Sequence, residues 1–319
     1  MIEFQNISKS YGGLCVVEGL NLHIARGELL VVIGPSGSGK STLLKMINRL
    51  EDHDAGRILF AGEEIYKFKV RDLRLRMGYA IQSVGLFPHW TVARNIATVP
   101  QMLGWPRERI QSRIDELLEL FQLDPEVYRE RYPHQLSGGQ QQRVGVARAL
   151  AGDPDVLLMD EPFGALDPVT RALLQLELKR VHALSGKTIV LVTHDIDEAL
   201  LLGTRIVLMN EGKIVQAASP LALLTRPTNA LVADFLGRSD RGIKLLSLQS
   251  AGTLARAEPR GAGEALPLDT SLREAVSFMA LHQIAQVNLL DAAGHFTGVL
   301  HAADIFAAHP QHPTPEATP

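Results

Sequence analysis

Hydrophobic and polar residues alternate near the N-terminus and then give way to an uninterrupted apolar run. The alternation over residues 2–4 and 20–24 predicts strands with one buried face. Residues 29–33 are apolar throughout, which predicts a fully buried strand. We therefore expect β-structure over residues 2–32, followed by a helix at 41–50.

The central part of the chain first has helical spacing and then alternates between strand and helix. From residue 107 to 150, apolar residues recur every three or four positions, which predicts helices that pack through this stripe. After Pro154, apolar runs of strand length alternate with helical patterns, which indicates a parallel sheet with crossover helices. The expected strands are 156–159, 189–193 and 206–209, and the expected helices are 171–183 and 197–202.

The C-terminal part changes composition. Two short helices, at 220–227 and 231–236, are expected to end the large domain. Residues 250–267 are rich in Ala, Gly and Pro, which is typical of a linker, and a helix–strand–strand–helix pattern follows them. The expected organisation is a large domain at 1–236, a linker at 237–267, a small α+β segment at 268–307 and a disordered, Pro-rich tail at 308–319.

Length and composition agree with one large and one small domain. The chain has 319 residues, of which 46% are hydrophobic, enough for a packed core. The formal net charge of -3 gives no support for a nucleic-acid partner. The one cysteine, Cys15, cannot form an internal disulfide and is expected to be a small buried residue of an N-terminal strand. This cysteine usage fits a reducing cytosol.

No segment suggests insertion into a membrane. The longest apolar runs are far shorter than the roughly 20 residues that a membrane helix needs. The N-terminus lacks the basic region, apolar core and cleavage site of a signal peptide. We expect a protein that is neither secreted nor membrane-spanning, so that it reaches a membrane only by docking onto another protein.

A phosphate-binding loop stands between the buried strand and the first helix. Residues 34–41 match the pattern G-x-x-x-x-G-K-S, in which glycines let backbone N–H groups surround a phosphate. Lys40 is expected to contact the β- and γ-phosphates, and the Ser41 hydroxyl to bind Mg²⁺. The expected nucleotide-binding residues of this segment are Gly34, Pro35, Ser36, Gly37, Ser38, Gly39, Lys40, Ser41 and Thr42.

Two further polar groups follow buried strands. Asp160 and Glu161 come directly after an apolar run, and His194 follows the next strand. Asp160 is expected to orient Mg²⁺ through water, and Glu161 to polarise the attacking water. The His194 imidazole is expected to hydrogen-bond the γ-phosphate. These side chains make hydrolysis of a nucleoside triphosphate the expected chemistry.

The segment Leu136-Ser137-Gly138-Gly139-Gln140 predicts a second anion site. Ser137 is a candidate helix N-cap, and the two glycines leave backbone N–H groups exposed at the helix start. One chain already surrounds the nucleotide from the phosphate-loop side. We therefore expect the second site to act on the nucleotide of a neighbouring chain.

These motifs, in this order, resemble the ATPase subunits of ATP-binding cassette (ABC) transporters. Tyr11 matches the aromatic residue that stacks on adenine, and Gln82 the glutamine that joins the metal site to a helical lobe. Residues 164–167 match a loop that crosses the dimer interface. The likeness covers residues 1 to about 236 and implies an α/β P-loop NTPase fold. That fold has a RecA-like parallel sheet, an N-terminal antiparallel β subdomain and a helical subdomain at about 84–150.

The resemblance also implies cofactors and partners. The family's head-to-tail dimer holds two ATP molecules with Mg²⁺, each gripped by one chain's phosphate loop and by Ser137, Gly138, Gly139 and Gln140 of the other. In that family Glu161, His194 and Gln82 would be catalytic, and Ser41, Gln82 and Asp160 would hold the metal. The expected partners are a second ATPase subunit in a homodimer and transmembrane permease subunits. The expected location is peripheral, on the cytoplasmic face of the bacterial inner membrane.

A narrower resemblance concerns the transported solute. Residues 82–90 and 95–100 resemble the ATPases of bacterial glycine betaine and related osmoprotectant importers. This implies import of a betaine-, choline- or carnitine-like amine, which a separate solute-binding protein would hold in an aromatic cage. Phe87, Pro88 and Trp90 either form a docking surface for the permease or pack the two lobes together.

Other interpretations stay open to different degrees. The motor motifs do not separate an osmoprotectant importer from an importer of another small solute such as an amino acid. A soluble, non-transport cassette protein acting on DNA or ribosomes is disfavoured, because the chain has one cassette, no sustained heptads and a small net charge. Intact Lys40, Glu161 and His194 argue against a purely regulatory nucleotide binder.

The small C-terminal segment resembles a single CBS motif, whereas osmoprotectant ATPases often carry two. This departure puts ionic-strength sensing in doubt and leaves dimerisation through the partner's copy as an alternative. Leu272, Val276 and Met279 are expected to be core residues of this segment.

Overall fold

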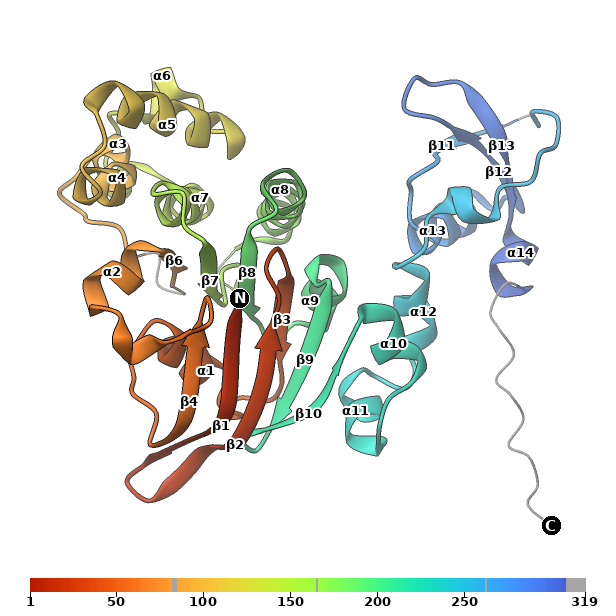
Figure 1. Ribbon diagram of the computed structural model, residues 1–319. Helices are drawn as coiled ribbons and strands as arrows, with labels where there is room; N and C mark the ends of the chain where they lie inside the picture. Colours follow the sequence, from red (N-terminus) through yellow and green to blue (C-terminus); the bar gives the residue numbers. More distant parts are fainter. Residues whose placement is uncertain (82–84, 165, 262, 308–319) are drawn as a thin grey trace, which may run out of the picture. The chain divides into compact units, whose positions relative to one another are not determined.

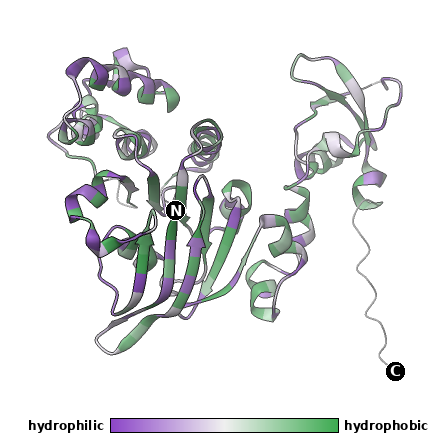
Figure 2. Cartoon of the chain, in the orientation of Figure 1, coloured by the Kyte–Doolittle hydropathy of each residue, from purple (hydrophilic) through white to green (hydrophobic). Residues whose placement is uncertain are grey.

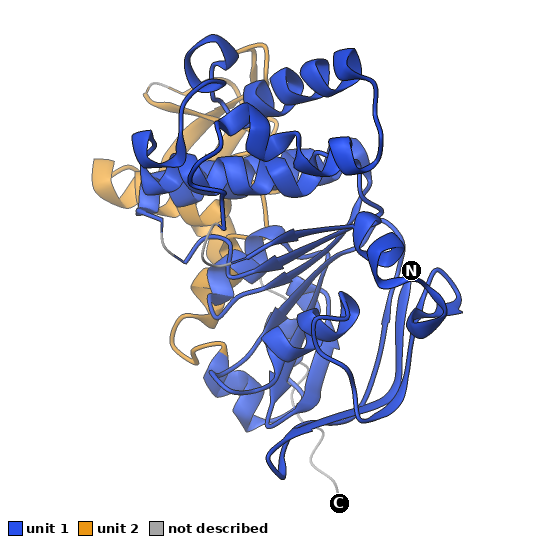
Figure 3. Ribbon diagram, turned by 90° about the vertical axis from the view of Figure 1, so that its left-hand side faces the viewer, with its two compact units in different colours: residues 1–235 blue, residues 236–319 orange. Residues whose placement is uncertain are grey.

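The computed structural model describes residues 1–81, 85–164, 166–261 and 263–307 (Figure 1). The chain divides into two compact units, Met1–Phe235 and Leu236–Pro319, which Figure 3 colours separately. Among the residues that the structure describes, no helix combines the length and apolar character that crossing a bilayer requires.

A parallel sheet forms the centre of the first unit. Its strand order is β10-β9-β3-β8-β7-β6, and only the edge strand β10 runs antiparallel to its neighbour. This confirms the predicted parallel sheet. Every residue of β3 is fully buried, as expected for a strand covered on both faces. The strands are β3 (Leu29–Ile33), β6 (Met77–Ala80), β7 (Val156–Asp160), β8 (Thr188–Val192), β9 (Arg205–Asn210) and β10 (Lys213–Ala218).

The crossover helices of this sheet are α1 (Lys40–Ile47), α8 (Pro168–Ser185) and α9 (Ile196–Leu202). The helix α1 contacts β7 and β8, and α9 contacts β3. Because parallel strands end at a common edge, the loops that follow β3, β7 and β8 lie near one another. This edge carries the phosphate loop and the candidate catalytic residues.

An antiparallel sheet of order β2-β1-β4-β5 packs on the parallel one. Its strands carry bands of both polarities in Figure 2, in agreement with the alternation of the sequence. One hydrophobic cluster joins Phe4, Ile24 and Phe60 of this sheet to α1 and to Val32 and Val190 of the parallel sheet. The elements are β1 (Ile2–Tyr11), β2 (Leu14–Ile24), β4 (Ala55–Phe60) and β5 (Glu63–Glu64), with η1 (Ile65–Lys67) and α2 (Val70–Leu75) after them.

The predicted burial of Cys15 is wrong. Cys15 is exposed on β2, and its thiol donates to the Val17 carbonyl at 3.3 Å. The hairpin of β1 and β2 extends past the core at this end, where Leu14 is 72% exposed. A strand pattern alone does not show how far a hairpin reaches beyond the layer that covers it.

Helices form a separate lobe between β6 and β7. The predicted apolar stripe is confirmed, since Ile110, Ile114, Leu117 and Leu118 of α5 are buried. The helix α7 contacts β6 and α3, which attaches the lobe to the sheet. The elements are α3 (Val92–Ile96), α4 (Thr98–Met102), α5 (Arg107–Leu120), α6 (Pro125–Tyr128), η2 (Pro133–Gln135) and α7 (Gly138–Leu150).

Asn95 holds together the loop that precedes this lobe. Its side chain is fully buried and accepts from the Phe87 N–H at 2.8 Å. Its amide nitrogen donates to the carbonyls of Phe87, Trp90 and Thr91 at 3.2, 3.1 and 3.0 Å. One side chain therefore adds hydrogen bonds to four backbone groups of residues 87–91, beside the backbone bonds that the Phe87 and Thr91 carbonyls already accept.

We expect Asn95→Ala to lower the free energy of unfolding by about 2–4 kcal/mol, because four hydrogen bonds of a fully buried side chain to the loop backbone are lost. Urea unfolding followed by circular dichroism measures the change. Gln101→Ala, which removes an exposed amide from the neighbouring helix α4, is the matched control and should change stability little. Equal stability of the two variants would contradict the role assigned to Asn95.

Two short helices, α10 (Pro220–Thr225) and α11 (Ala230–Phe235), end the first unit. The second unit contains the predicted helix–strand–strand–helix series around a sheet of order β11-β12-β13. Leu272 and Met279 are buried and Val276 packs against them, as expected of core residues. The elements are α12 (Arg241–Leu246), η3 (Ala251–Leu254), β11 (Ala265–Pro267), α13 (Leu272–His282), β12 (Gln286–Leu290), β13 (Phe296–His301) and α14 (Ala302–Ala307).

The predicted linker at 237–267 contains regular structure over much of its range. The helix α12 contacts α13, and β11 pairs in parallel with β12. Leu246 and Ala251 belong to the core of the second unit. Both elements are short, with six residues in α12 and three in β11, so neither is long enough to show a periodic apolar pattern. The predicted tail at 308–319 lies outside the described residues.

Candidate functional site

The phosphate loop has a backbone that only glycine adopts easily at two key positions. Gly34 has φ +148°, and a Cβ there would lie 2.1 Å from the Met209 carbonyl oxygen. Gly39 has φ +97°, and its Cβ would lie 2.7 Å from the Val16 carbonyl oxygen. Any side chain at either position would displace the loop from the sheet. The strand–loop–helix context predicted for a phosphate site is present.

Lys40 begins α1 and folds back into the loop. Its ammonium donates to the carbonyls of Gly34 and Pro35, both at 2.8 Å, and its side chain is largely buried. Burial lowers the pKa of Lys40, and the nearby charges of Glu161 and Asp160 oppose that shift. The loop thus surrounds a cation, which suits the binding of phosphate oxygens. Thr42 is half-buried on the same helix, and Pro35, Ser36 and Gly37 are exposed.

Ser41 and Asp160 come together from different elements. The Ser41 hydroxyl donates to Asp160 Oδ1 at 2.9 Å, which joins the first turn of α1 to the end of β7. Burial raises the pKa of Asp160, and the hydrogen bond from Ser41 works in the opposite direction. The half-buried Asp160 carboxylate and the Ser41 hydroxyl offer two oxygen ligands for a hard cation. The charge of such a cation would stabilise the ionised form of the carboxylate.

These two oxygens fit Mg²⁺ better than a metal that needs a full protein cage. The described residues contain no cluster of three or more His, Cys, Asp or Glu side chains suited to a metal. Mg²⁺ typically takes one or two protein oxygens and completes its shell with water and phosphate oxygens. Gln82, the third predicted metal ligand, lies outside the described residues.

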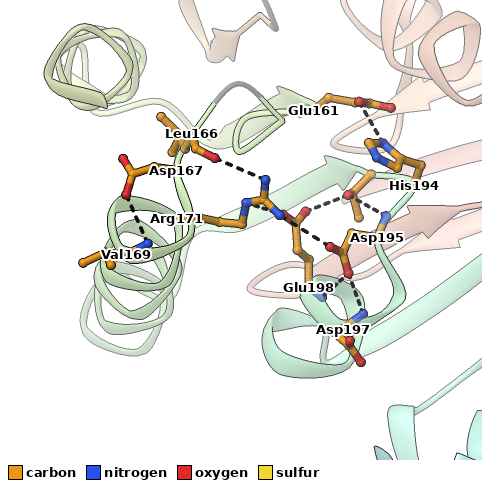
Figure 4. Close-up of polar contacts among 10 residues, drawn as sticks. Glu161, Leu166, Asp167, Val169, Arg171, His194, Asp195, Asp197 and Glu198 are labelled. Carbon is orange, nitrogen blue, oxygen red and sulfur yellow. Dashed lines mark hydrogen bonds and ion pairs between the residues drawn. The ribbon is translucent and has the colours of Figure 1, made fainter. Parts of the chain in front are cut away.

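Glu161 and His194 are in direct contact. His194 Nδ1 lies 3.0 Å from Glu161 Oε2, although the two residues follow different strands (Figure 4). Glu161 has φ +47°, a left-handed conformation that costs a residue with a Cβ about 1–2 kcal/mol. Its N–H donates to the Val192 carbonyl at 2.9 Å, which fixes this conformation at the sheet edge. The structure therefore brings together the predicted base and the predicted γ-phosphate contact.

Ser137 caps α7, as predicted. Its hydroxyl accepts from the Gln140 N–H at 3.3 Å, and Gln140 Oε1 accepts from the Ser137 N–H at 2.9 Å, which together form a capping box. Gly138 has open space where a Cβ would stand. At Gly139, a Cβ would approach the Thr170 side chain to 2.5 Å, so this glycine also allows α7 to pack against α8.

The capped helix end makes its polar contacts in the helical lobe. In the ranges that the structure describes, no hydrogen bond or ion pair joins residues 137–140 to residues 34–41 or to Asp160 and Glu161. Besides its bonds to Ser137, Gln140 donates from Nε2 to the Tyr128 hydroxyl at 3.0 Å, in the helical lobe.

Two other predicted residues, Tyr11 and Asp167, lie at the ends of secondary-structure elements. Tyr11 ends β1 with 43% of its surface exposed, and Lys9 Nζ lies 5.1 Å from its ring centre. Asp167, in the loop at 164–167, caps α8 by accepting from the N–H groups of Val169 and Thr170. Ala165 of the same loop lies outside the described residues.

A hydrogen-bond network that was not predicted joins the residues on either side of His194 to α9. The Thr193 hydroxyl donates to Glu198 Oε2 at 2.6 Å and accepts from the Asp195 N–H at 3.0 Å. Glu198 is only 5% exposed, and burial raises its pKa. Thr193 and Glu198 stand on either side of a helix start, and this spacing could have indicated their hydrogen bond. A glutamate on a helix is ordinarily exposed to solvent, so the sequence alone favoured no such contact.

The chain is similar in sequence to known proteins. A family model described as "ABC transporter" matches residues 17–164. The glycine betaine uptake system ATP-binding protein YehX of Escherichia coli (strain K12) is 58% identical over 305 residues, covering 96% of this chain and 99% of YehX. The osmoprotectant import ATP-binding protein OsmV of Salmonella typhimurium is 45% identical over 299 residues, covering 92% of this chain and 77% of OsmV.

Solved structures agree with the sequence relatives. A dimeric ATP-binding cassette in a post-hydrolysis state, bound to ADP and Pi, superposes with a TM-score of 0.63 at 33% identity. The match covers 69% of this chain and 99% of that cassette.

Proposed function

Because the chain belongs to the family of ABC transporter ATPases, we propose that it powers import of glycine betaine or a related quaternary ammonium osmoprotectant. The observation that carries this proposal is the near full-length likeness to YehX, a glycine betaine uptake protein, together with intact phosphate-loop and catalytic residues. Choline and carnitine are the related solutes that belong to the same chemical class. The solute itself would be held by a separate binding protein.

ATP is the substrate, and the loop at 34–41 with Lys40 would hold its phosphates. Ser41 and Asp160 would hold Mg²⁺, which neutralises charge on the phosphates when bound. Glu161 would take the proton of the attacking water, and His194, which lies beside Glu161, would hydrogen-bond the γ-phosphate. Most of the rate enhancement in such a site comes from positioning and charge neutralisation.

Two copies of the chain would form each complete site. The capped start of α7 offers backbone N–H groups and a helix dipole, and among the described residues no hydrogen bond or ion pair joins it to its own phosphate loop. The likeness to a dimeric cassette supports use of this end on the partner's ATP. Closure on ATP and opening after hydrolysis would drive the permease between two states.

A cavity of about 360 Å³ supports docking of a permease segment on the first unit. It lies between β6 and the helical lobe and is lined by Tyr79, Phe87, Val99 and Arg148, among others. Phe87 is 44% exposed and packs on Trp90 with ring centres 4.4 Å apart. An exposed Phe87 ring beside a cavity, supported by the half-buried Trp90, favours a docking role for Phe87 over simple packing between lobes. Through the permease, the chain would sit on the cytoplasmic face of the inner membrane.

Uptake by cells that carry the whole transporter tests this function. We expect cells with the Glu161→Gln chain to take up labelled glycine betaine, choline or carnitine at least about tenfold more slowly than cells with the parental chain. The control solute is a labelled amino acid, whose uptake should not change. Unaltered uptake of all three amines would overturn the osmoprotectant assignment, and slower amino-acid uptake would favour the alternative importer.

A further inference from the structure

Arg171 lies between the loop at 164–167 and the segment that carries His194. It belongs to the first turn of α8, and its guanidinium donates to the Leu166 carbonyl at 3.2 Å (Figure 4). On its other side, Nη1 lies 3.8 Å from Asp195 Oδ2, and Nε lies 4.0 Å from Glu198 Oε1. One side chain thus faces two carboxylates of a neighbouring helix start and a carbonyl of the loop.

The two carboxylates control the backbone on either side of His194. Asp195 Oδ1 accepts from the N–H groups of Asp197 and Glu198 at 2.8 and 3.2 Å and so caps α9. Glu198 accepts the Thr193 hydroxyl at 2.6 Å, and that hydroxyl accepts the Asp195 N–H. The residues before and after His194 are therefore fixed by groups that Arg171 faces.

Arg171 makes a hydrogen bond to the Leu166 carbonyl but none to the carboxylates of Asp195 and Glu198. Its Nε is buried without a hydrogen-bond partner. Both ion-pair distances exceed the ordinary hydrogen-bond range, so a movement of about 1 Å would bring the guanidinium into contact with Asp195 and Glu198. A planar guanidinium can bind a carboxylate through two parallel hydrogen bonds, which a lysine cannot do.

We propose that Arg171 is a positioning residue that couples Leu166 to His194. The proposal rests on the proposed two-chain site, in which a partner subunit would contact Leu166 and Asp167. When the partner displaces the Leu166 carbonyl, the guanidinium moves onto Glu198 and Asp195. This movement adds charge-assisted contacts to the two carboxylates that hold residues 193 and 195, so that the contact of His194 with Glu161 is kept during turnover. ATP hydrolysis then proceeds at full rate only when the partner is seated.

The test uses the purified full-length chain and separates catalysis from binding. We expect Arg171→Gln to lower kcat about tenfold while KM for ATP changes less than about twofold. Glu198→Gln keeps an acceptor for Thr193 but removes the charge, and it should lower kcat to a similar extent. The double variant should be no slower than Arg171→Gln alone, because both changes break one contact. Arg171→Lys should retain about a third of the parental kcat.

The matched control is Arg180→Gln, an exposed arginine on the same helix, which should leave kcat unchanged. Hydrogen exchange gives a second measurement that does not depend on turnover. Arg171→Gln should speed exchange of the backbone amides at 193–199, and Arg180→Gln should not. A parental kcat in Arg171→Gln, or losses in the double variant that multiply to about a hundredfold, would overturn the proposal.

A merely structural role is also recognisable. It would raise KM and lower the melting temperature along with kcat, and Arg171→Lys would not restore activity above that of Arg171→Gln. Either result would overturn the coupling proposal. The two-chain site itself is tested separately by mixing variants of the phosphate loop and of the α7 start, so its failure is distinguishable from failure of this inference.

Discussion

Glutamine at position 161 will lower ATP turnover by about 10³-fold and leave ATP affinity within about threefold of the parental value. The side chain keeps its shape and its oxygen, so an interaction with His194, now 3.0 Å from Glu161, can persist. It cannot take a proton from water, which is the step assigned to Glu161. Phosphate release measures turnover, and titration with ATP measures affinity.

The chain offers a closely matched control for this change. Glu211 has the same φ of +47° as Glu161, but it lies exposed in the turn between β9 and β10. Glu211→Gln should leave turnover unchanged, which separates loss of the base from any effect of glutamine in a left-handed conformation. With ATP and Mg²⁺ present, Glu161→Gln should also accumulate as a dimer in size-exclusion chromatography. Turnover at the parental rate would show that Glu161 is not the general base.

The phosphate loop and the capped start of α7 could be predicted because each is formed by residues close together in the sequence. The apolar run at 29–33, the glycines after it and the helix from Lys40 form one continuous strand–loop–helix segment. Ser137 and Gln140 are three residues apart, so their capping box follows from local chemistry. Ends of parallel strands meet at one edge of a sheet, which brought Glu161 and His194 together as expected.

The features that escaped prediction depend on contacts between distant segments. Nothing in the sequence around Asn95 indicated that the fold turns its side chain toward the backbone of residues 87–91. Arg171 and Glu198 are 27 positions apart, and only the packing of α8 against α9 makes them neighbours. The strand β11 is identified by its pairing with β12 and not by its own three residues.

Sharing of the active sites between two chains can be tested with two single variants. Lys40→Ala removes the ammonium that lies within the phosphate loop, and we expect it to reduce turnover to less than about one per cent. Gly138→Asp places a negative charge at the start of α7. A Cβ at Gly138 meets no atom within 4 Å, and an acidic residue in the first helical turn is favourable, so this variant should fold normally. Its carboxylate would repel the phosphates of the partner's ATP, and its turnover should fall as far.

Mixing the two inactive proteins restores one complete site in each mixed dimer, since the intact phosphate loop of one chain then faces the intact α7 start of the other. With random pairing at equal amounts, about a quarter of all sites are intact. ATP turnover of the mixture, compared with each variant alone, tests the account most directly. We predict recovery to about a quarter of the parental rate. A mixture as inactive as its components, with Glu161-dependent hydrolysis intact in the parental protein, would contradict a site built from two chains.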